Sequence, residues 1–391
     1  MMATQLSGTD DRRRSGLDAV AVHRRRMLVI CPYPEGVAAG QRLKYEQYLD
    51  DWRAIGFDVD VAPFMDRKMW DVLYSRGHLA TKVWGTIKGY VRRFSILGRL
   101  RRYDVVFIHM WFTPFGTAFM ERVVRKLAPR IIFDVEDNVL TEQQSRGNNP
   151  NPVIGMLKGS GKARFLITNA DHVITSSPYL NEYCAKLNQR QACTYISSSV
   201  DTDRFRPSDR LGERPDGLVT IGWTGTFSSR EYLDAIAPML QELASRVRYR
   251  LRIIGNFDYS LPGVDLEVVQ WTAEHEVRDL QAIDIGLYPL PRNDWVLGKS
   301  GLKAIQYMAF GIPPVATDVG TAQLLIRDGD NGVLVRSDAD WLKVLERLVQ
   351  DAEQRKRLGA AARVDAVAKY SVAAIRADYR RVLADVTEER A

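Results

Sequence analysis

The sequence predicts an α/β protein made of two doubly wound domains, each built on a parallel sheet. The chain has 391 residues, a length that suits two hydrophobic cores of roughly 150 to 200 residues each. Short apolar runs of the buried parallel-strand type alternate with amphipathic stretches of helical period. This series stops at a polar segment, residues 206–217, and then starts again. A ligand-binding cleft is therefore expected between the two halves.

The composition is that of a globular protein. Hydrophobic residues make up 46% and charged residues 26% of the chain, which excludes wholesale disorder, a collagen-like fibre and an all-helical coiled coil. Lys and Arg number 55 against 48 Asp and Glu, and this modest excess without an aromatic and basic reader motif argues against a nucleic-acid partner. Cys31, Cys184 and Cys193 are too scattered for a disulfide framework or a zinc site. No apolar run reaches the roughly 18 residues of a spanning helix, so we expect a cytoplasmic protein, at most peripheral at the inner membrane face.

The first domain is expected over residues 27–205, after a polar leader, residues 1–26, that lacks apolar periodicity and is expected to be disordered. Its strands are predicted from apolar runs at residues 27–31, 57–61, 105–108, 131–133, 172–175 and 193–196. An amphipathic helix is predicted at residues 43–55, after a loop rich in Pro and Gly that ends at Gly40.

The second domain is expected over residues 206–370. Its strands are predicted at residues 218–223, 249–254, 266–269, 283–288, 314–316 and 332–335. Its helices are predicted at residues 232–247, 274–281, 302–310 and 339–348. The third of these helices stops at Gly311, and a buried strand follows Pro313.

Two glycine-containing loops of the second half each follow a strand and open a helix. The first spans residues 222–230 and the second begins at Gly298. Small residues let backbone N–H groups approach an anion, and a helix N-terminus adds a favourable dipole. Lys299 and Lys303 stand on either side of the second helix start, as a diphosphate clamp would require. The alternative is a pair of tight, capped turns with two solvated lysines.

Four motifs of the second half carry a family resemblance. They are Asp284-Ile-Gly-Leu-Tyr-Pro-Leu-Pro291, Gly298-Lys299 with Lys303, Gln306-Tyr-Met-Ala-Phe-Gly-Ile-Pro313 and Asp328-Gly-Asp-Asn-Gly-Val-Leu-Val335. Through them the chain resembles the retaining glycosyltransferases of family 4 (glycosyl transferase group 1), over nearly all of its length after residue 26. The resemblance implies the GT-B fold of two Rossmann-like domains with parallel sheets that face each other across a cleft. It also implies that residues 371–391 form a helix that packs back toward the first domain.

The resemblance implies an enzyme, a hexosyltransferase-like protein without a prosthetic group. Such an enzyme moves a sugar from a nucleotide diphosphate sugar to a hydroxyl of a saccharide, a lipid-linked saccharide or a small molecule. Surface polysaccharide, glycolipid or glycoconjugate biosynthesis is the expected context. Asp201-Thr-Asp203 has the spacing of an acidic metal site, but it falls in a segment that resembles the connection between the domains, so a metal-independent reaction is expected. Cations and backbone N–H groups must then offset the charge of the departing diphosphate.

The resemblance also implies which residues hold the donor. The family's Glu-x7-Glu positions correspond here to Gly298 and Gln306, which are 306 − 298 = 8 apart, so both glutamates are absent. Gln306 can still exchange hydrogen bonds with ribose hydroxyls, and Asp294 is the expected replacement for the first carboxylate. The family's Arg and Lys of the first loop are missing too, since Thr226 and Tyr232 stand near those places. The expected donor-binding residues are Gly225, Thr226, Arg230, Trp271, Asp294, Gly298, Lys299, Ser300, Gly301, Leu302, Lys303 and Gln306.

Two of these assignments rest on particular arguments. Arg230, with Lys299 and Lys303, is an expected substitute for the missing cations of the first loop. Trp271 begins a strand-to-helix segment, residues 271–276, that lies beside the nucleobase in the resembling fold. A helix capped by Thr272 explains the same segment equally well, and both readings stay open.

The first half is expected to hold the acceptor. Gly40 and Arg42 lie in a loop that, in the family, faces the donor phosphates and the acceptor. The strand end at residues 133–137 carries Asp134, Glu136 and Asp137, which are expected to orient or deprotonate an acceptor hydroxyl unless they only cap a helix. His109, at another strand end, is a further catalytic candidate, although a lone histidine is more often satisfied within the structure.

A basic amphipathic stretch, residues 88–102, could rest on anionic lipid or could form an ordinary solvated helix face. Two rival functions also stay open. One is a transferase for a natural-product aglycone, with an apolar acceptor pocket and no membrane affinity. The other is a catalytically silent GT-B partner or scaffold, which the loss of both glutamates favours and the retained lysines, glycine loops and strand-end acids oppose.

Overall fold

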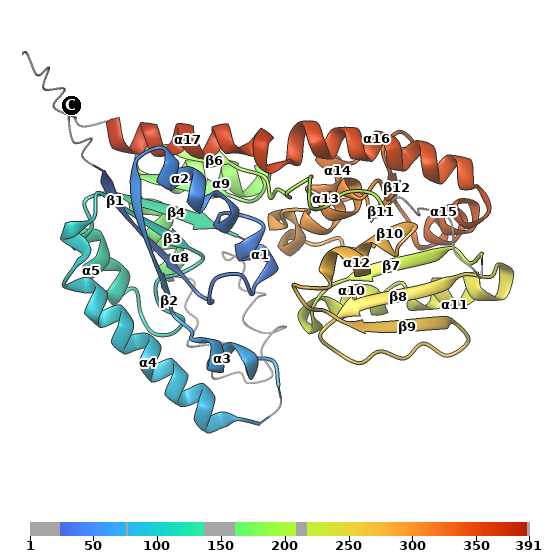
Figure 1. Ribbon diagram of the computed structural model, residues 1–391, viewed down its shortest axis with the longest axis horizontal. Coiled ribbons are helices and arrows are strands. Elements are labelled where there is room, and N and C mark those ends of the chain that lie inside the picture. The colour runs from blue at the N-terminus through green and yellow to red at the C-terminus, as the bar shows by residue number, and fades with distance from the viewer. Residues whose placement is uncertain (1–23, 76, 137–160, 209–216, 389–391) are drawn as a thin grey trace, which may run out of the picture.

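Two parallel sheets of six strands each form the centres of two domains that face each other (Figure 1). The structure is a computed structural model that describes residues 24–75, 77–136, 161–208 and 217–388. The predicted fold class is confirmed. The leader expected over residues 1–26 lies outside the described residues up to residue 23, and Arg25 and Arg26 belong to the first strand.

The first sheet has the strand order β2-β1-β3-β4-β5-β6. Its strands are β1 (Arg25–Cys31), β2 (Phe57–Pro63), β3 (Val105–His109), β4 (Ile131–Val135), β5 (His172–Thr175) and β6 (Cys193–Tyr195). Successive side chains of a strand point to opposite faces of the sheet, and both faces are buried here. Leu28 and Ile30 pack into one core, whereas Met27 and Val29 pack into the other, which explains why β1 reads as a continuous apolar run.

Helices cover both faces of this sheet. They are α1 (Ala39–Arg42), α2 (Leu49–Ala54), α3 (Arg67–Asp71), α4 (Leu79–Leu97), α5 (Phe119–Leu127), α8 (Gly161–Asn169) and α9 (Pro178–Leu187), with 3₁₀ turns η1 (Glu46–Tyr48) and η2 (Leu100–Arg102). The single helix predicted at residues 43–55 is wrong, because the chain forms η1 and then α2 in its place. Tyr45 and Tyr48 are fully buried there, so tertiary packing overrides the helical period.

The second sheet has the order β12-β11-β10-β7-β8-β9. Its strands are β7 (Thr220–Thr224), β8 (Arg250–Gly255), β9 (Asp265–Gln270), β10 (Ile285–Tyr288), β11 (Pro314–Thr317) and β12 (Val333–Val335). All neighbouring pairs are parallel, with Ile221 of β7 opposite Leu251 of β8. The carboxyl ends of parallel strands share one edge, so the loops that follow these strands meet there.

The helices of the second half are η3 (Phe227–Ser229), α10 (Arg230–Asp234), α11 (Ala237–Arg246), α12 (Glu276–Gln281), η4 (Asp294–Gly298), α13 (Leu302–Ala309), α14 (Ala322–Leu325), α15 (Asp338–Gln350) and α16 (Ala352–Tyr370). The helix predicted at residues 232–247 is split into α10 and α11. Pro238 lies in the first turn of α11, where its missing N–H is tolerated but would interrupt a longer helix.

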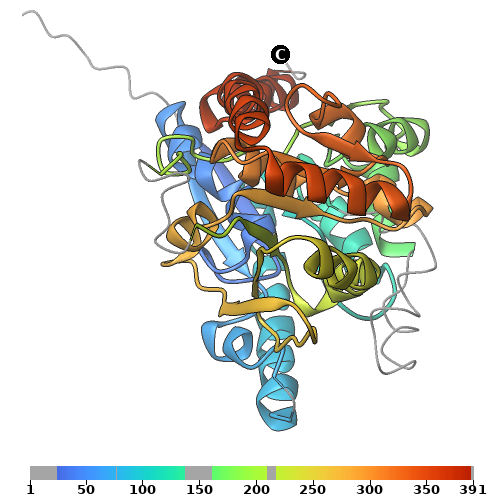
Figure 2. The ribbon, with the colours of Figure 1, turned by 90° about the vertical axis from the view of Figure 1, so that its right-hand side faces the viewer.

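The last two helices connect the halves. α16 and α17 (Val372–Glu388) run along one side of both domains (Figure 1), and Figure 2 shows them from the end of the second domain. Arg363 of α16 donates to the carbonyls of Thr202, Phe205 and Ala309, which fixes the connecting segment to the second domain. Tyr379 of α17 packs in the core of the first domain. None of the described helices is long and apolar enough to cross a membrane.

Candidate active site

The two halves contact each other through residues that follow strand ends. Nη2 of Arg42, in α1, lies 2.6 Å from Oε2 of Glu276, the first residue of α12. The hydroxyl of Ser176, just after β5, donates to the carbonyl of Gly298 at 3.0 Å. Both contacts join the predicted acceptor half to the predicted donor half. The candidate site is therefore a region between domains, as the topology predicts.

Arg42 holds an unusual position for an arginine. Its guanidinium lies 5.9 Å from the ring centroid of Trp271 and pairs with the buried Glu276. Its Nε and Nη1 atoms are buried and have no hydrogen-bond partner among the described residues. Buried N–H groups without a partner are costly, so this guanidinium suits an additional anionic or polar ligand.

Glu276 links Arg42 to Gln306. Its second oxygen, Oε1, accepts a hydrogen bond from Nε2 of Gln306 at 3.3 Å. Its side chain is only 1% exposed. Gln306 stands where the resembling family has a glutamate, and the carboxylate of Glu276 lies directly beside it. The sequence names Glu276 only as the end of a strand-to-helix segment, because an acidic residue in the first turn of a helix is an ordinary dipole partner.

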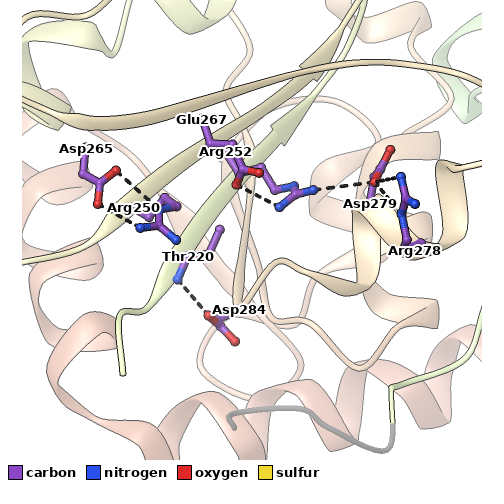
Figure 3. A network of polar contacts seen from close by, with 8 residues as sticks. All are labelled: Thr220, Arg250, Arg252, Asp265, Glu267, Arg278, Asp279 and Asp284. Carbon is purple, nitrogen blue, oxygen red and sulfur yellow. Dashed lines mark hydrogen bonds and ion pairs between the residues drawn. The ribbon is translucent and has the colours of Figure 1, made fainter. Parts of the chain in front are cut away.

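Figure 3 shows a polar network of the second domain that connects α12 to the sheet through Asp279. Asp279, one turn after Glu276, is buried and lies 3.6 Å from Nη2 of Arg252 on β8. The same arginine pairs with Glu267 on β9 at 2.8 Å. On the neighbouring strand, the backbone N–H of Thr220 donates to Asp284 at 2.7 Å. These contacts fix α12 against the sheet and therefore fix Glu276 beside the cleft.

Lys303 is the cation at the other end of this site. It lies on α13 one turn before Gln306, so both side chains share one face of the helix. Its ammonium lies 4.4 Å from the ring centroid of the buried Trp223 and 3.3 Å from the Ser229 hydroxyl. No ion pair of Lys303 with a carboxylate occurs among the described residues. Burial, aided by the nearby Lys299, lowers the pKa of Lys303 to about 7.

The glycine loops are close-packed around this lysine. A Cβ on Gly225 would lie 2.3 Å from the Trp223 ring and 2.7 Å from the Ser229 hydroxyl. Gly301 caps α13 with φ of 76°, and a Cβ there would meet Leu325 at 2.3 Å. Close packing therefore already explains why glycine stands at both positions, and this weakens the argument that the two loops are there to bind phosphate. The hydroxyl of Thr226 is engaged by that of Ser228 at 2.8 Å.

The other predicted donor residues make different contacts. The guanidinium of Arg230 pairs with Asp234 at 3.4 Å and lies 5.3 Å from the Tyr259 ring centroid. Asp294 is exposed in η4, and Lys299 lies over the Trp295 ring at 5.2 Å. Ser300 is buried beside Gly301, and Leu302 begins α13. Contacts therefore join Arg42, Trp271 and Gln306 in one group and Lys303 with the loop after β7 in another.

The first half contributes a buried chain of charged groups. Nδ1 of His109, at the end of β3, lies 2.6 Å from Asp134 on β4. The other oxygen of Asp134 lies 3.0 Å from Nζ of Lys44, and all three side chains have no exposed surface. Burial alone would raise the pKa of Asp134, but the Lys44 charge and the His109 hydrogen bond hold it below its ordinary value. An ionised Asp134 then keeps the proton of His109 on Nδ1.

At the end of this series of charged groups, Nε2 of His109 is the atom that remains available to a ligand. It has no hydrogen-bond partner among the described residues and lies 3.7 Å from Oε2 of Glu136. A Cβ on Gly40 would lie 3.0 Å from the same oxygen, so the α1 loop passes directly over Glu136. Met110, which follows His109 in the sequence, has φ of 62°, a strained value for a residue other than glycine. Asp134 lies beneath His109, and Asp137 lies outside the described residues.

No metal cluster accompanies these acids. Over residues 24–75, 77–136, 161–208 and 217–388, no three His, Cys, Asp or Glu side chains are grouped to hold an ion. Oδ1 of Asp201 accepts the backbone N–H of Asp203 at 3.0 Å. The Asp-Thr-Asp segment is thus a capped turn between the domains.

Comparisons with known proteins bear on the family of this chain. A family model described as "Glycosyl transferases group 1" matches residues 219–351. A D-inositol 3-phosphate glycosyltransferase of Paenarthrobacter aurescens is 35% identical over 291 residues, which are 66% of this chain and 67% of that protein. A protein of the same name from Streptomyces bingchenggensis is 28% identical over 66% of this chain and 62% of its own length. The chain spans between about half and two thirds of the length of such relatives.

Solved structures share the architecture. Sucrose-phosphate synthase from Thermosynechococcus elongatus superposes with a TM-score of 0.68 at 17% identity, over 93% of this chain and 100% of that one. Anabaena HepE in complex with UDP-glucose superposes with a TM-score of 0.60 at 13% identity, over 92% and 99%. These identities show the fold alone. Together with the Paenarthrobacter aurescens relative and the matched family model, they establish that the chain belongs to the group 1 glycosyl transferases with the GT-B fold.

Proposed function

We propose that this protein is a retaining glycosyltransferase of family 4 that moves a hexose from a nucleotide diphosphate sugar to a hydroxyl acceptor. The observation that carries the proposal is the pairing of two cations around one helix. Lys303 of α13 has no carboxylate partner among the described residues, and Arg42, which reaches α12 from the first domain, keeps two buried nitrogens unpaired. A dianionic leaving group is the ligand that such a pair would offset.

The donor would lie along α13. Trp271 offers an aromatic face for a base, and Gln306 with Glu276 offers an amide and a carboxylate for ribose hydroxyls. Lys303 would meet the diphosphate as the glycosidic bond breaks, and Arg42 would approach it from the first half. With these cations supplying positive charge, we propose that transfer needs no metal ion. The uridine nucleotides named in the HepE structures make UDP the first base to test.

The acceptor side would be built on His109. Its Nε2, held by the Asp134 hydrogen bond on the other ring nitrogen, can accept from a hydroxyl or orient one near the sugar. Oε2 of Glu136 lies 3.7 Å from Nε2, so Glu136 is the acid on that side of the ring that could take a proton. Relatives named D-inositol 3-phosphate glycosyltransferase make this phosphorylated cyclitol the first acceptor to test, ahead of saccharide and lipid-linked acceptors of polysaccharide or glycolipid biosynthesis.

A catalytically silent nucleotide-sugar-binding protein is the second candidate. The observation that favours it is Gly298, which puts no side chain where the family has a sugar-binding glutamate, while its carbonyl is occupied by Ser176. Binding and transfer must therefore be measured separately.

The test begins with calorimetric titration of UDP, GDP and ADP and their glucose conjugates, with and without Mg²⁺. Lys303→Met should weaken the preferred nucleotide at least about tenfold, since a charged hydrogen bond contributes about 1.5 to 3 kcal/mol. Lys356→Met is the matched control, because that lysine is exposed on α16 and pairs only with Glu353 among the described residues. Transfer to inositol 3-phosphate is then followed by NMR, which reads the anomeric configuration. Tight binding without transfer to any acceptor would favour the silent protein, and no nucleotide binding would overturn both.

A further inference from the structure

Helix α4 exposes its large apolar side chains instead of burying them. Leu79 is 74%, Val91 62% and Phe94 59% exposed. At 100° per residue, the exposed apolar positions fall within an arc of roughly 140°. We call this arc the α4 stripe; it consists of Leu79, Val83, Trp84, Ile87, Val91 and Phe94.

The opposite face of α4 is firmly seated, so the stripe is not the result of a loosely placed helix. A Cβ on Gly89 would lie 2.5 Å from the Phe64 ring, and one on Gly85 would lie 2.7 Å from Sδ of Met69. The buried guanidinium of Arg93 donates to the carbonyls of Cys31, Ala62 and Phe112. The helix therefore packs through two glycines, Arg93 and, near its end, Ile96, and turns its other large apolar side chains away from the core.

Basic residues flank the α4 stripe. Residues 79–102 contain seven Lys and Arg and no Asp or Glu. Arg93 is buried and Arg92 pairs with Asp66 at 3.3 Å, so the remaining basic side chains are Lys82, Lys88, Arg99, Arg101 and Arg102. Lys88 lies at the edge of the stripe, with its ammonium 5.8 Å from the Trp84 ring centroid. Arg99, Arg101 and Arg102 are exposed just beyond the helix.

We propose that the α4 stripe docks on an anionic lipid bilayer. An interfacial helix has an apolar face with Trp, Phe or Leu and a flanking set of Lys and Arg that meet lipid phosphates. Long basic side chains can reach up from the interface while their methylenes stay in apolar surroundings. Residues 79–102 contain no acid, and the neighbouring Asp66 pairs with Arg92 of α4, so the charge that remains beside the stripe is basic and complements anionic lipid headgroups.

The position of α4 leaves the stripe accessible. In Figure 1 the helix lies along the outer side of the first domain, across the molecule from α16 and α17, and in Figure 2 it projects beyond the rest of the chain. Docking through α4 would hold the first domain against the bilayer and leave the second domain in solution. This inference does not depend on the proposed glycosyl transfer, because it concerns a different surface.

Flotation with vesicles tests it without any substrate. The full chain should bind vesicles of phosphatidylcholine with phosphatidylglycerol, bind phosphatidylcholine alone much less, and dissociate at high salt. The paired substitution Val83→Ser with Val91→Ser should lower partitioning into vesicles about tenfold, since each substitution replaces two methyl groups that would be buried in the lipid with one hydroxyl. Lys88→Glu with Arg99→Glu should abolish the preference for the anionic lipid.

A matched control separates docking from general stickiness. Val364 and Val367 of α16 are 68% and 43% exposed, so Val364→Ser with Val367→Ser changes the same chemistry on another helix and should leave flotation unchanged. Melting temperature should be unchanged in both pairs, because the side chains are exposed. No binding of the full chain to anionic vesicles would overturn the proposal, as would equal loss in both pairs. A dimer that the α4 pair converts to monomer, seen by light scattering, would instead show a contact between two copies.

Discussion

At the scale of single residues, Lys303 has the property that most constrains the site. Its pKa of about 7 means that the empty protein carries this charge on only part of its molecules near neutral pH. A bound diphosphate would favour the charged form and raise that pKa. Nucleotide binding should therefore take up a proton.

Proton uptake gives a quantitative prediction. At pH 8 a lysine with a pKa of about 7 is about one tenth protonated, so binding should take up close to one proton per site. Calorimetric titration in buffers of different ionisation enthalpy measures this number. Affinity should fall as pH rises above about 7, since the proton must then come from solution. Lys303→Met should bind more weakly with no uptake; uptake that persists in this variant would move the titration to another group.

Lys44 is expected to affect activity indirectly, because it keeps Asp134 ionised and Asp134 in turn positions His109. In Lys44→Met the burial of Asp134 is no longer offset by the ammonium, so the pKa of Asp134 should rise. The native carboxylate contributes stability above its unfolded pKa of about 3.9, and this contribution is lost as pH falls through its lower folded value. The acid limb of kcat/KM should move up by at least about one pH unit, and unfolding free energy should fall by about 3 to 5 kcal/mol.

The double variant tests that explanation. Lys44→Met with Asp134→Asn removes both charges, so it should recover much of the stability that Lys44→Met loses. Urea denaturation of the two single variants and the double variant measures the coupling. If the double variant is only as stable as the sum of the single losses predicts, the pair is not coupled, and Lys44 is structural on its own account.

Residues of this kind explain what the sequence can and cannot predict about the site. The lysine at 303 and the glutamine at 306 lie in one short segment that a motif can reveal. The residues that contact the site from elsewhere do not lie in one segment. Arg42 and Glu276 are 234 positions apart, and Lys44 meets Asp134 only in the folded first domain. A lysine in an amphipathic stretch or a glutamate at a helix start carries no local sign of such a contact.

At the scale of elements, the strands were predicted well because both faces of each sheet are buried and each strand is a continuous apolar run. The helices were predicted less well. η1 interrupts one predicted helix because Tyr45 and Tyr48 turn into the core, and Pro238 divides another. α4 begins at Leu79, nine residues before the basic stretch of residues 88–102, and ends within that stretch at Leu97.

The seat of α17 on the first domain offers a test at this scale. Tyr379 is 1% exposed, with its ring centroid 4.6 Å from that of Tyr48. Its hydroxyl has no hydrogen-bond partner among the described residues. Tyr379→Ala should lower unfolding free energy by about 3 to 5 kcal/mol through the cavity it leaves. Tyr379→Phe should be neutral or stabilise by up to about 1 kcal/mol, since it removes a buried unsatisfied group. Thermal unfolding measures both, and a large loss in Tyr379→Phe would mean that the hydroxyl has a partner.

At the scale of the whole molecule, the two domains are held by α16, α17 and a few polar contacts across the cleft. Of these, the Arg42–Glu276 pair is the charged one whose members both belong to the candidate site. The pair uses Nη2 of Arg42 and leaves Nε and Nη1 without a hydrogen-bond partner among the described residues. The guanidinium can therefore meet a diphosphate while it pairs with Glu276, and the pair should help to hold the two domains together.

Glu276→Gln tests whether this pair holds the domains closed. Breaking a buried pair ordinarily costs about 3 to 5 kcal/mol, but here the domains can separate and return Arg42 to water. The loss should therefore appear in the opening equilibrium: without ligand the radius of gyration from small-angle X-ray scattering should increase, while the melting temperature changes by less than about 2 °C. Glu346→Gln, which removes the charge of a half-buried partner of Arg246 far from the cleft residues in sequence, is the control and should change neither quantity. An unchanged radius with a fall of many degrees in melting temperature would make the pair part of the fold, since the arginine would then have no open state in which to regain water.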